Sequence, residues 1–244
     1  MASPRVQQIL LEVLDFDKPD PPARSGATVW DRLCASVTTA VPVTGAGIAL
    51  MIPSGHGGTL AATDEAAGVI ENLQETLGEG PCLNAFHDRR PVLHPDLPEA
   101  ATRWPAFTPA ATQAGIAAVF AFPLQIGAIR LGVLDLYRDA PGSLDTLQLT
   151  EAIDYATAAT TMLVDLQHAT SPGELHPQLA DAADEHREIH QATGVIAAQA
   201  SVPINEALLL LRARAYADER PLLGLAQDVV ARRVTFSPEV DHHE

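Results

Sequence analysis

Apolar residues follow two different spacings along the chain, and these spacings mark out helices and strands. Short apolar runs bounded by glycine or proline predict strands at 45–52, 58–63, 92–97, 116–124 and 131–137. Apolar residues recurring every three or four positions predict helices at 27–40, 66–77, 105–114 and 144–166. This order of elements predicts an α+β sandwich, a mostly antiparallel sheet with helices on one side.

The helix predicted at 144–166 closes this series and carries a stripe of small and apolar side chains. The stripe consists of Leu149, Ala152, Ala156, Ala159, Leu163 and Leu166. Small residues at such a spacing allow a second helix to approach closely, which predicts a homodimer seam. Packing of the same stripe on the domain's own sheet is an equally weighted interpretation, and both can hold on different faces of the helix.

The chain divides at the helix-breaking sequence Ser171-Pro172-Gly173. Beyond it, three helical patterns run over 179–199, from Pro203 and from Pro221, which predicts a compact all-α unit of three helices. The predicted organisation is an N-terminal helix and linker at 1–26, an α+β domain at 27–168, the three-helix unit at 174–236 and an acidic tail at 237–244.

Composition narrows the functional classes. The 244 residues are 47% hydrophobic, and the net charge of −16 argues against charge-driven capture of DNA or anionic membranes. The longest apolar run, 116–124, is far shorter than the roughly 18 residues of a membrane span. The N-terminus lacks a signal-peptide pattern, and the two cysteines form neither a metal-type pair nor a disulfide framework. We therefore expect a cytoplasmic protein with no membrane association.

One motif points to a ligand-binding domain. The segment 77–83 reads LGEGPCL, and 90–97 reads RPVLHPDL. Two glycines and a proline force a sharp bend after the helix at 66–77. This motif resembles the loop over the ligand pocket of GAF domains, and the order of elements is also that of GAF domains. The resemblance implies a sensor for an unknown small molecule.

Five residues are candidates for the ligand pocket that this resemblance implies: Cys82, His94, Phe120, Phe122 and Asp135. Cys82 is interpreted first as a small buried residue, and a reactive thiol acting on an oxidised metabolite is a distant alternative. Asp135 lies in an apolar strand, on the same face as Val133 and Tyr137. It either points to water, which we favour, or contacts a ligand.

The remaining candidate chemistry is sparse. His186 and His190 are four residues apart, a spacing that can hold a metal, but no third ligand is fixed by the sequence and a solvated pair is favoured. The sequence contains no phosphate-cradling glycine loop and no nucleophile elbow. We therefore predict no catalysis, no metal site and no cofactor.

The C-terminal unit resembles an ANTAR domain. The resemblance rests on 190–196 (HQATGVI), 205–207 (NEA), 211–215 (LRARA), 220–222 (RPL) and 225–226 (LA). It implies a dimeric RNA-binding module that grips paired stem-loops in nascent transcripts and prevents transcription termination. The implied RNA-binding residues are Arg187, His190, Gln191, Thr193, Arg212 and Arg214. Thr193 stands where many family members have lysine, and Arg212 and Arg214 point about 200° apart on a helix.

Taken together, these features predict a cytoplasmic regulator in which a ligand-responsive GAF sensor controls an antiterminating RNA-binding unit. The alternative is a dimeric protein-interaction scaffold whose ANTAR-like unit does not bind RNA. Salt-dependent RNA binding that requires Arg212 distinguishes the two.

Overall fold

The structure is a computed structural model that describes residues 3–15, 27–52, 55–168, 171 and 176–236. Most of the predicted linker before residue 27, most of the predicted domain break and the whole acidic tail lie outside the described residues. We call residues 3–168 the N-terminal unit and residues 176–236 the C-terminal unit.

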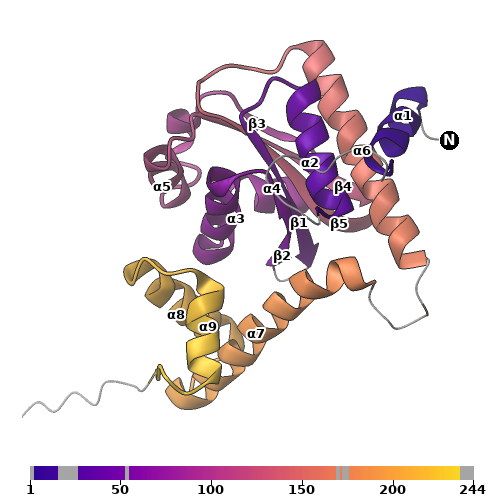
Figure 1. Cartoon of the computed structure of the whole chain (residues 1–244). Helices are drawn as coiled ribbons and strands as arrows, with labels where there is room; N and C mark the ends of the chain where they lie inside the picture. The colour runs from indigo at the N-terminus through magenta and orange to yellow at the C-terminus, as the bar shows by residue number, and fades with distance from the viewer. Residues whose placement is uncertain (1–2, 16–26, 53–54, 169–170, 172–175, 237–244) are drawn as a thin grey trace, which may run out of the picture.

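The described strands form one five-stranded antiparallel sheet, in the order β2-β1-β5-β4-β3 (Figure 1). The strands are β1 (Gly45–Ile52), β2 (Gly55–Ala62), β3 (Val92–His94), β4 (Ala118–Ile126) and β5 (Ile129–Arg138). β5 lies at the centre, between β1 and β4. The predicted α+β fold is confirmed, including its antiparallel sheet.

Helices cover both faces of this sheet, so the prediction of helices on one side is wrong (Figure 1). The first face packs against α1 (Pro4–Val13), α2 (Val29–Ala40) and α6 (Thr146–His168). The second face packs against α3 (Glu65–Leu77), α4 (Pro81–Asp88) and α5 (Phe107–Gln113). A short 3₁₀ helix, η1 (Leu97–Ala100), precedes α5. Side chains on both faces of the strands are buried, which explains why these strands read as continuous apolar runs.

The small-residue stripe of α6 packs on its own sheet. Ala152, Ala156, Ala159 and Leu163 are buried in the apolar core that also contains Phe120. The interpretation of the stripe as an intramolecular contact is therefore confirmed. A homodimer stays a prediction.

The motif at 77–83 joins three helices. Gly78 ends α3 in the left-handed conformation, with φ of 66°, and Pro81 begins α4. Glu79 Oε1 accepts hydrogen bonds from the backbone N–H groups of Ala106 and Phe107, at 2.7 and 2.8 Å, and so caps the start of α5. The predicted bend is confirmed, but the sequence analysis missed α4, which places Cys82 in a helix rather than in a loop.

The C-terminal unit comprises α7 (Pro177–Ala200), α8 (Ile204–Ala217) and α9 (Leu222–Val230), which confirms an all-helical unit. Its own core includes Ile196, Leu211 and Leu225. The first turns of α7 belong to the N-terminal unit instead. Leu179 joins the first-face core, and α7 passes so close to β2 that a Cβ on Gly58 would lie 2.3 Å from the backbone oxygen of Ala182. One helix thus contributes to the cores of both units.

Among the described residues, no single helix is long and apolar enough to span a membrane. Within the described part of the chain, one pair of helical segments, His186–Ala200 and Ile204–Ala217, is long and apolar enough when taken together, and the two are bent by 104° relative to each other.

Candidate functional site

A cluster of polar side chains interrupts the second face of the sheet. Its centre is Asp135 on β5, which is 6% exposed, so the expectation that this carboxylate points to water is wrong. Asp135 pairs across the sheet with Gly47 on β1 and Ala121 on β4. These directly paired residues share a face, and neither carries a bulky side chain. The sheet therefore leaves space beside Asp135.

Helix α3 fills much of this space with a second carboxylate, that of Glu71. The most buried line of α3 runs through Ala67, Ile70, Glu71 and Gln74. Gly47 makes room for Glu71, since a Cβ at Gly47 would lie 2.5 Å from Glu71 Oε1. The sequence analysis missed Glu71 and Gln74. No pattern in the sequence singles out these two residues, because the space opposite Asp135 depends on the register of β1 with β5.

Cys82 completes the cluster from the first turn of α4. Its backbone N–H donates a 2.7 Å hydrogen bond to Gln74 Oε1, and its Sγ lies 3.6 Å from Met51 Sδ. Ligand atoms of Cys82, Glu71 and Asp135 all lie within 4.8 Å of one another. Burial, then the charges of Asp135 and Glu71, raise the pKa of the Cys82 thiol well above its usual range. A thiol held protonated in this way is a poor nucleophile, which argues against the catalytic alternative for Cys82.

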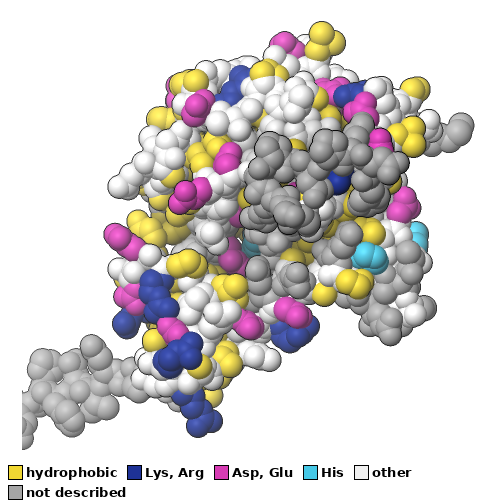
Figure 2. All heavy atoms as spheres, viewed as in Figure 1, with side chains coloured by type: hydrophobic (Ala, Val, Ile, Leu, Met, Phe, Trp, Pro, Cys, Tyr) yellow, Lys and Arg dark blue, Asp and Glu magenta, His cyan; other side chains and the backbone are white. Residues whose placement is uncertain are grey.

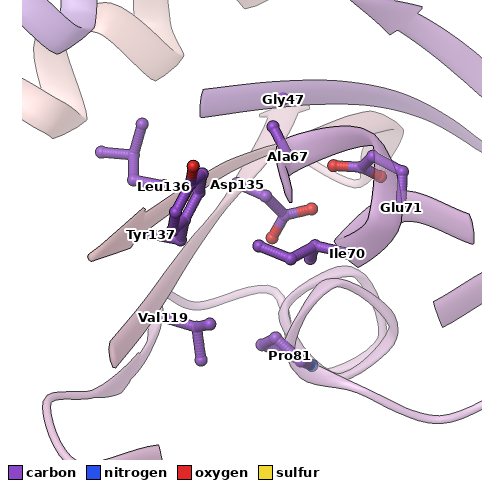
Figure 3. A pocket seen from close by; sticks show the side chains of 9 residues that line it. All are labelled: Gly47, Ala67, Ile70, Glu71, Pro81, Val119, Asp135, Leu136 and Tyr137. Atoms are coloured by element: carbon purple, nitrogen blue, oxygen red, sulfur yellow. The ribbon is translucent and has the colours of Figure 1, made fainter. Parts of the chain in front are cut away.

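A small cavity opens between these side chains (Figure 3). The cavity measures about 10 Å³, and its lining includes Gly47, Glu71, Asp135 and Tyr137. In Figure 3 the carboxylates of Asp135 and Glu71 point toward the same space between the sheet and α3. This volume is close to that needed by one water molecule. In this conformation the cavity admits a water or a single ion, and no organic ligand.

Electrostatics connect this cluster to the C-terminal unit through His56 on β2. His56 Nε2 lies 3.4 Å from Glu71 Oε2, and its Nδ1 lies 3.7 Å from Glu75 Oε1. Burial alone would lower the pKa of His56, but the two carboxylates more than offset it and raise the pKa to about 10. Burial, followed by repulsion from Glu71, raises the pKa of Asp135 well above its usual range. The sequence analysis missed His56 as well.

The other predicted pocket residues lie elsewhere. Phe120 and Phe122 face the first side of the sheet, in the apolar core, so the structure does not bring them to Asp135. His94 on β3 packs its ring edge-on against Trp104, with the ring centroids 4.7 Å apart. Burial, then the charge of Arg103, lowers the pKa of His94. Of the five predicted residues, only Cys82 and Asp135 meet in one site.

A second and larger pocket lies between the two units. Its volume is about 420 Å³, a size typical of small-molecule sites at domain interfaces. The N-terminal unit contributes His56 and Glu75 to its lining. The C-terminal unit contributes His186, Ile189, His190, Thr193, Ile204, Asn205, Leu208, Leu209, Arg212 and Leu222.

Arg212 reaches across this interface. Its guanidinium nitrogens lie against Gly78 and Gly55, where an added Cβ would be 2.6 and 3.7 Å away. The Arg212 Nε is buried and has no hydrogen-bond partner among the described residues. Burial lowers the pKa of Arg212, while the Glu75 carboxylate opposes that effect. The guanidinium therefore packs on the end of α3 and is covered by the N-terminal unit.

The other residues of the predicted RNA-binding set are dispersed. Thr193 is buried, and its hydroxyl donates to the backbone oxygen of Ile189 at 2.7 Å, so in this conformation it faces the inside of the bundle. Arg187 pairs with Asp184 and Arg214 pairs with Asp218, each at 2.6 Å. His190 and Gln191 are exposed. Figure 2 shows arginine and acidic side chains interspersed over the C-terminal helices.

The family model described as "GAF domain" matches residues 26–164, more than half of the chain. This chain belongs to the GAF domain family. The match contains the whole sheet and the cluster around Asp135, so we call this part the GAF domain. The match ends before the C-terminal unit, whose ANTAR resemblance therefore stays a prediction. No curated protein matches the chain.

Several solved structures resemble this one. A GAF domain from an Acinetobacter phosphoenolpyruvate-protein phosphotransferase is 12% identical, with a TM-score of 0.49 over 70% of this chain and 96% of that chain. A GAF domain from the Coxiella burnetii phosphoenolpyruvate-protein phosphotransferase is 14% identical, with a TM-score of 0.47 over 68% and 95%. A sensor histidine kinase domain from Sinorhizobium meliloti 1021 is 20% identical, with a TM-score of 0.48 over 61% and 97%.

Proposed function

We propose that this protein is a ligand-responsive transcription regulator, in which the GAF domain controls RNA binding by the C-terminal unit. The ligand-sensing role follows from membership of the GAF family, whose domains commonly bind small molecules. RNA binding with antitermination is the output that the ANTAR resemblance implies. In this proposal the protein works in the cytoplasm, as a homodimer, and catalyses no reaction.

The observation that carries the proposal is the shared pocket between the two units. His190, Thr193 and Arg212 belong to the predicted RNA-binding set, and all three line a pocket that His56 and Glu75 of the GAF domain close. An arginine that packs on the end of α3 is withheld from a phosphate backbone. The docked arrangement is therefore the inactive one, and a signal in the GAF domain releases the C-terminal unit.

A population shift explains how such a signal acts. A ligand that binds the undocked arrangement more tightly moves the equilibrium toward it, by no more than its difference in affinity for the two states. The contacts that must change are those of α3 and β2 with α7 and α8. α3 also carries Glu71, so the helix that borders the cavity beside Asp135 is the one that contacts α8.

RNA binding by the full chain tests the proposal. The probe is a fluorescent RNA with two adjacent hexaloop stem-loops, titrated at several salt concentrations. Glu75→Arg places a cation beside Arg212 and repels α8 from α3. We expect it to bind the RNA at least about tenfold more tightly than the wild type, a difference of about 1.4 kcal/mol. Adding Arg212→Ala should weaken binding again and reduce its salt dependence.

Glu65→Arg is the matched control for charge. It makes the same change at an exposed position of the same helix, about 15 Å along the helix axis from Glu75. It should bind RNA as the wild type does. Equal gains from both variants would attribute the effect to net charge and would contradict the docking mechanism.

The ion pairs of the C-terminal unit favour a second candidate function, that of a protein-interaction scaffold. Arg187 and Arg214 each hold an acidic neighbour, and Asp228 lies 2.5 Å from Arg220 and 2.6 Å from Arg233. Cations neutralised in this way contribute little to binding a polyanion. A folded, dimeric Glu75→Arg variant that binds no RNA at low salt would support the scaffold and overturn the RNA-binding proposal.

A further inference from the structure

We propose that the second face of the GAF domain binds one divalent cation of the Zn²⁺ class through Cys82 Sγ and the carboxylates of Asp135 and Glu71. If the GAF domain senses a ligand, as the proposed function holds, this ion is that ligand. The proposal rests on the proposed function only for this sensing role. Metal binding is measured without RNA, so failure of the RNA output and failure of the metal site are distinguishable.

The three ligands come from three elements that the fold already brings together. Cys82 lies on α4, Glu71 on α3 and Asp135 on the central strand β5. Their ligand atoms lie within 4.8 Å of one another. Ligands about 2.0–2.3 Å from a tetrahedral zinc ion are about 3.5 Å apart. Side-chain adjustments of about 1 Å therefore suffice to close the site.

Two oxygen atoms of the cluster lack a partner. Glu71 Oε1 and Asp135 Oδ2 are buried and have no hydrogen-bond partner among the described residues. Both residues are more than nine-tenths buried, with exposed fractions of 2% and 6%. Figure 3 shows both carboxylates pointing into the space beside the small cavity. Buried polar atoms are almost always satisfied, so these two oxygens indicate an occupant that accepts their lone pairs.

Charge favours a cation as that occupant. Two carboxylates that share a buried space repel each other, and only a proton or a cation relieves the repulsion. His56 contacts the carboxylates of both Glu71 and Glu75. The charge of His56 is therefore shared between these two residues. A divalent ion offsets the charges of Asp135 and Glu71 together, which a single proton does not. The Cys82 thiol releases its proton to solvent when its sulfur binds the ion, and the thiolate adds one negative charge to the site.

The size of the space and the kinds of ligand define the ion. A cavity of about 10 Å³ has room for one ion beside Glu71 and Asp135, and three protein ligands leave the fourth position of a tetrahedral ion open. A thiolate among the ligands, with the Met51 thioether 3.6 Å from it, selects Zn²⁺ or a similar thiophilic ion over Mg²⁺ and Ca²⁺. The contact of His56 with Glu71 is of the kind that orients metal ligands from outside.

The test uses the full chain after removal of metal with a chelator. Zn²⁺ binding is measured by calorimetry and elemental analysis, and Co²⁺ serves as a spectroscopic probe for thiolate coordination. We expect one ion per chain and a thiolate-to-cobalt charge-transfer band. Cys82→Ser should abolish the band and weaken Zn²⁺ binding at least about tenfold. Mg²⁺ and Ca²⁺ should not compete.

Cys34→Ser is the matched control, because Cys34 is the other buried free thiol and lies on the first face of the sheet. It should retain both the band and the affinity. Asp135→Asn keeps the shape of the side chain and should lose Zn²⁺ binding while keeping a cooperative thermal unfolding transition. The midpoint temperature of that transition should rise with Zn²⁺ in the wild type and in Cys34→Ser, but not in Asp135→Asn or Cys82→Ser.

Two results would overturn the proposal. One is a folded wild-type chain that binds no Zn²⁺ and gives no cobalt band, which leaves a shared proton as the occupant of the cluster. The other is Zn²⁺ binding that survives Cys82→Ser but is lost in His190→Gln, which assigns the ion to the pair His186 and His190.

Discussion

The two faces of the GAF sheet are built from the same strands and serve different purposes. On the first face, Leu134 and Leu136 of β5 meet large side chains such as Phe120 and Trp30, and the packing is almost entirely apolar. On the second face, Asp135 stands between those two leucines in sequence and is flanked across the sheet by Gly47 and Ala121. Around Asp135, small residues and a buried carboxylate take the place of the large apolar side chains that fill the rest of this face.

With the proposed metal site, this difference separates the face that supplies stability from the face that binds the ligand. Close packing on the first face supplies a firm support, because most of its large apolar side chains are fully buried. The second face departs from that pattern at Asp135, Glu71 and Cys82. Buried polar groups that local rules disfavour are found where a protein binds or reacts. The alternation along β5 is therefore the reason for placing the proposed metal site on the second face.

The largest expected effect comes from the first face. Phe120→Ala should lower the free energy of unfolding by about 3–5 kcal/mol, because it leaves a large cavity in the apolar core. In chelated protein, Asp135→Asn should change that free energy by less than about 1 kcal/mol, because it relieves repulsion from Glu71 while losing little packing. Urea denaturation measures both. A larger loss from Asp135→Asn than from Phe120→Ala would show that the polar cluster is structural.

Metal removal should have the next largest effect, and only through the second face. Zn²⁺ at about one hundred times its dissociation constant should raise the free energy of unfolding by about 2.7 kcal/mol. Chelation should reverse this gain, as followed by thermal unfolding with and without Zn²⁺. A gain of the same size in Cys82→Ser would place the ion elsewhere.

A substitution at Gly47 tests whether the space between β1 and Glu71 is needed. Gly47→Ala should lower the free energy of unfolding by about 1–3 kcal/mol, because its Cβ would meet Glu71 Oε1 at 2.5 Å and displace the carboxylate. Gly68→Ala is the matched control within α3, where an added Cβ meets nothing within 4 Å. It should raise the free energy of unfolding by about 0.5–1 kcal/mol, because alanine favours the helix. Equal losses from the two variants would disprove crowding at Glu71.

The smallest effect is expected at the surface of the C-terminal unit. Arg214→Ala should change the free energy of unfolding by no more than about 0.5 kcal/mol, because its pair with Asp218 is exposed. Arg212→Ala should instead loosen the contact between the two units, seen as faster proteolysis or hydrogen exchange of α8. Indistinguishable behaviour of the two variants would argue that Arg212 does not secure the docked arrangement.

Much of the fold could be predicted from the sequence, since it depends on local spacing. The apolar runs gave all five strands, and three- and four-residue spacing gave α2, α3, α6 and the helices of the C-terminal unit. The sequence analysis missed α4, because the bend at Gly78 and Gly80 masked a helix that begins at Pro81. The same spacing predicted α5, but the placement of helices on both faces of the sheet was missed, because a continuous apolar run does not show which of its faces is covered.

The candidate site was only partly predictable. Cys82 and Asp135 could be predicted as candidates, because a thiol in a glycine-rich motif and a carboxylate in an apolar strand are unusual. Glu71 was invisible, since a glutamate on an amphipathic helix is normally solvated. Only the register that sets Gly47 opposite Asp135 reveals the space that this side chain occupies. The placement of Arg212 on α3 is a tertiary contact that no local pattern encodes.

Hydrogen–deuterium exchange of the full chain, with and without Zn²⁺, tests most directly whether the second face is the sensing face. The account predicts slower exchange with Zn²⁺ in α3, α4 and β5, unchanged exchange in α2, and no such difference in Cys82→Ser. Protection centred on α2 and α6, or protection that persists in Cys82→Ser, would contradict it.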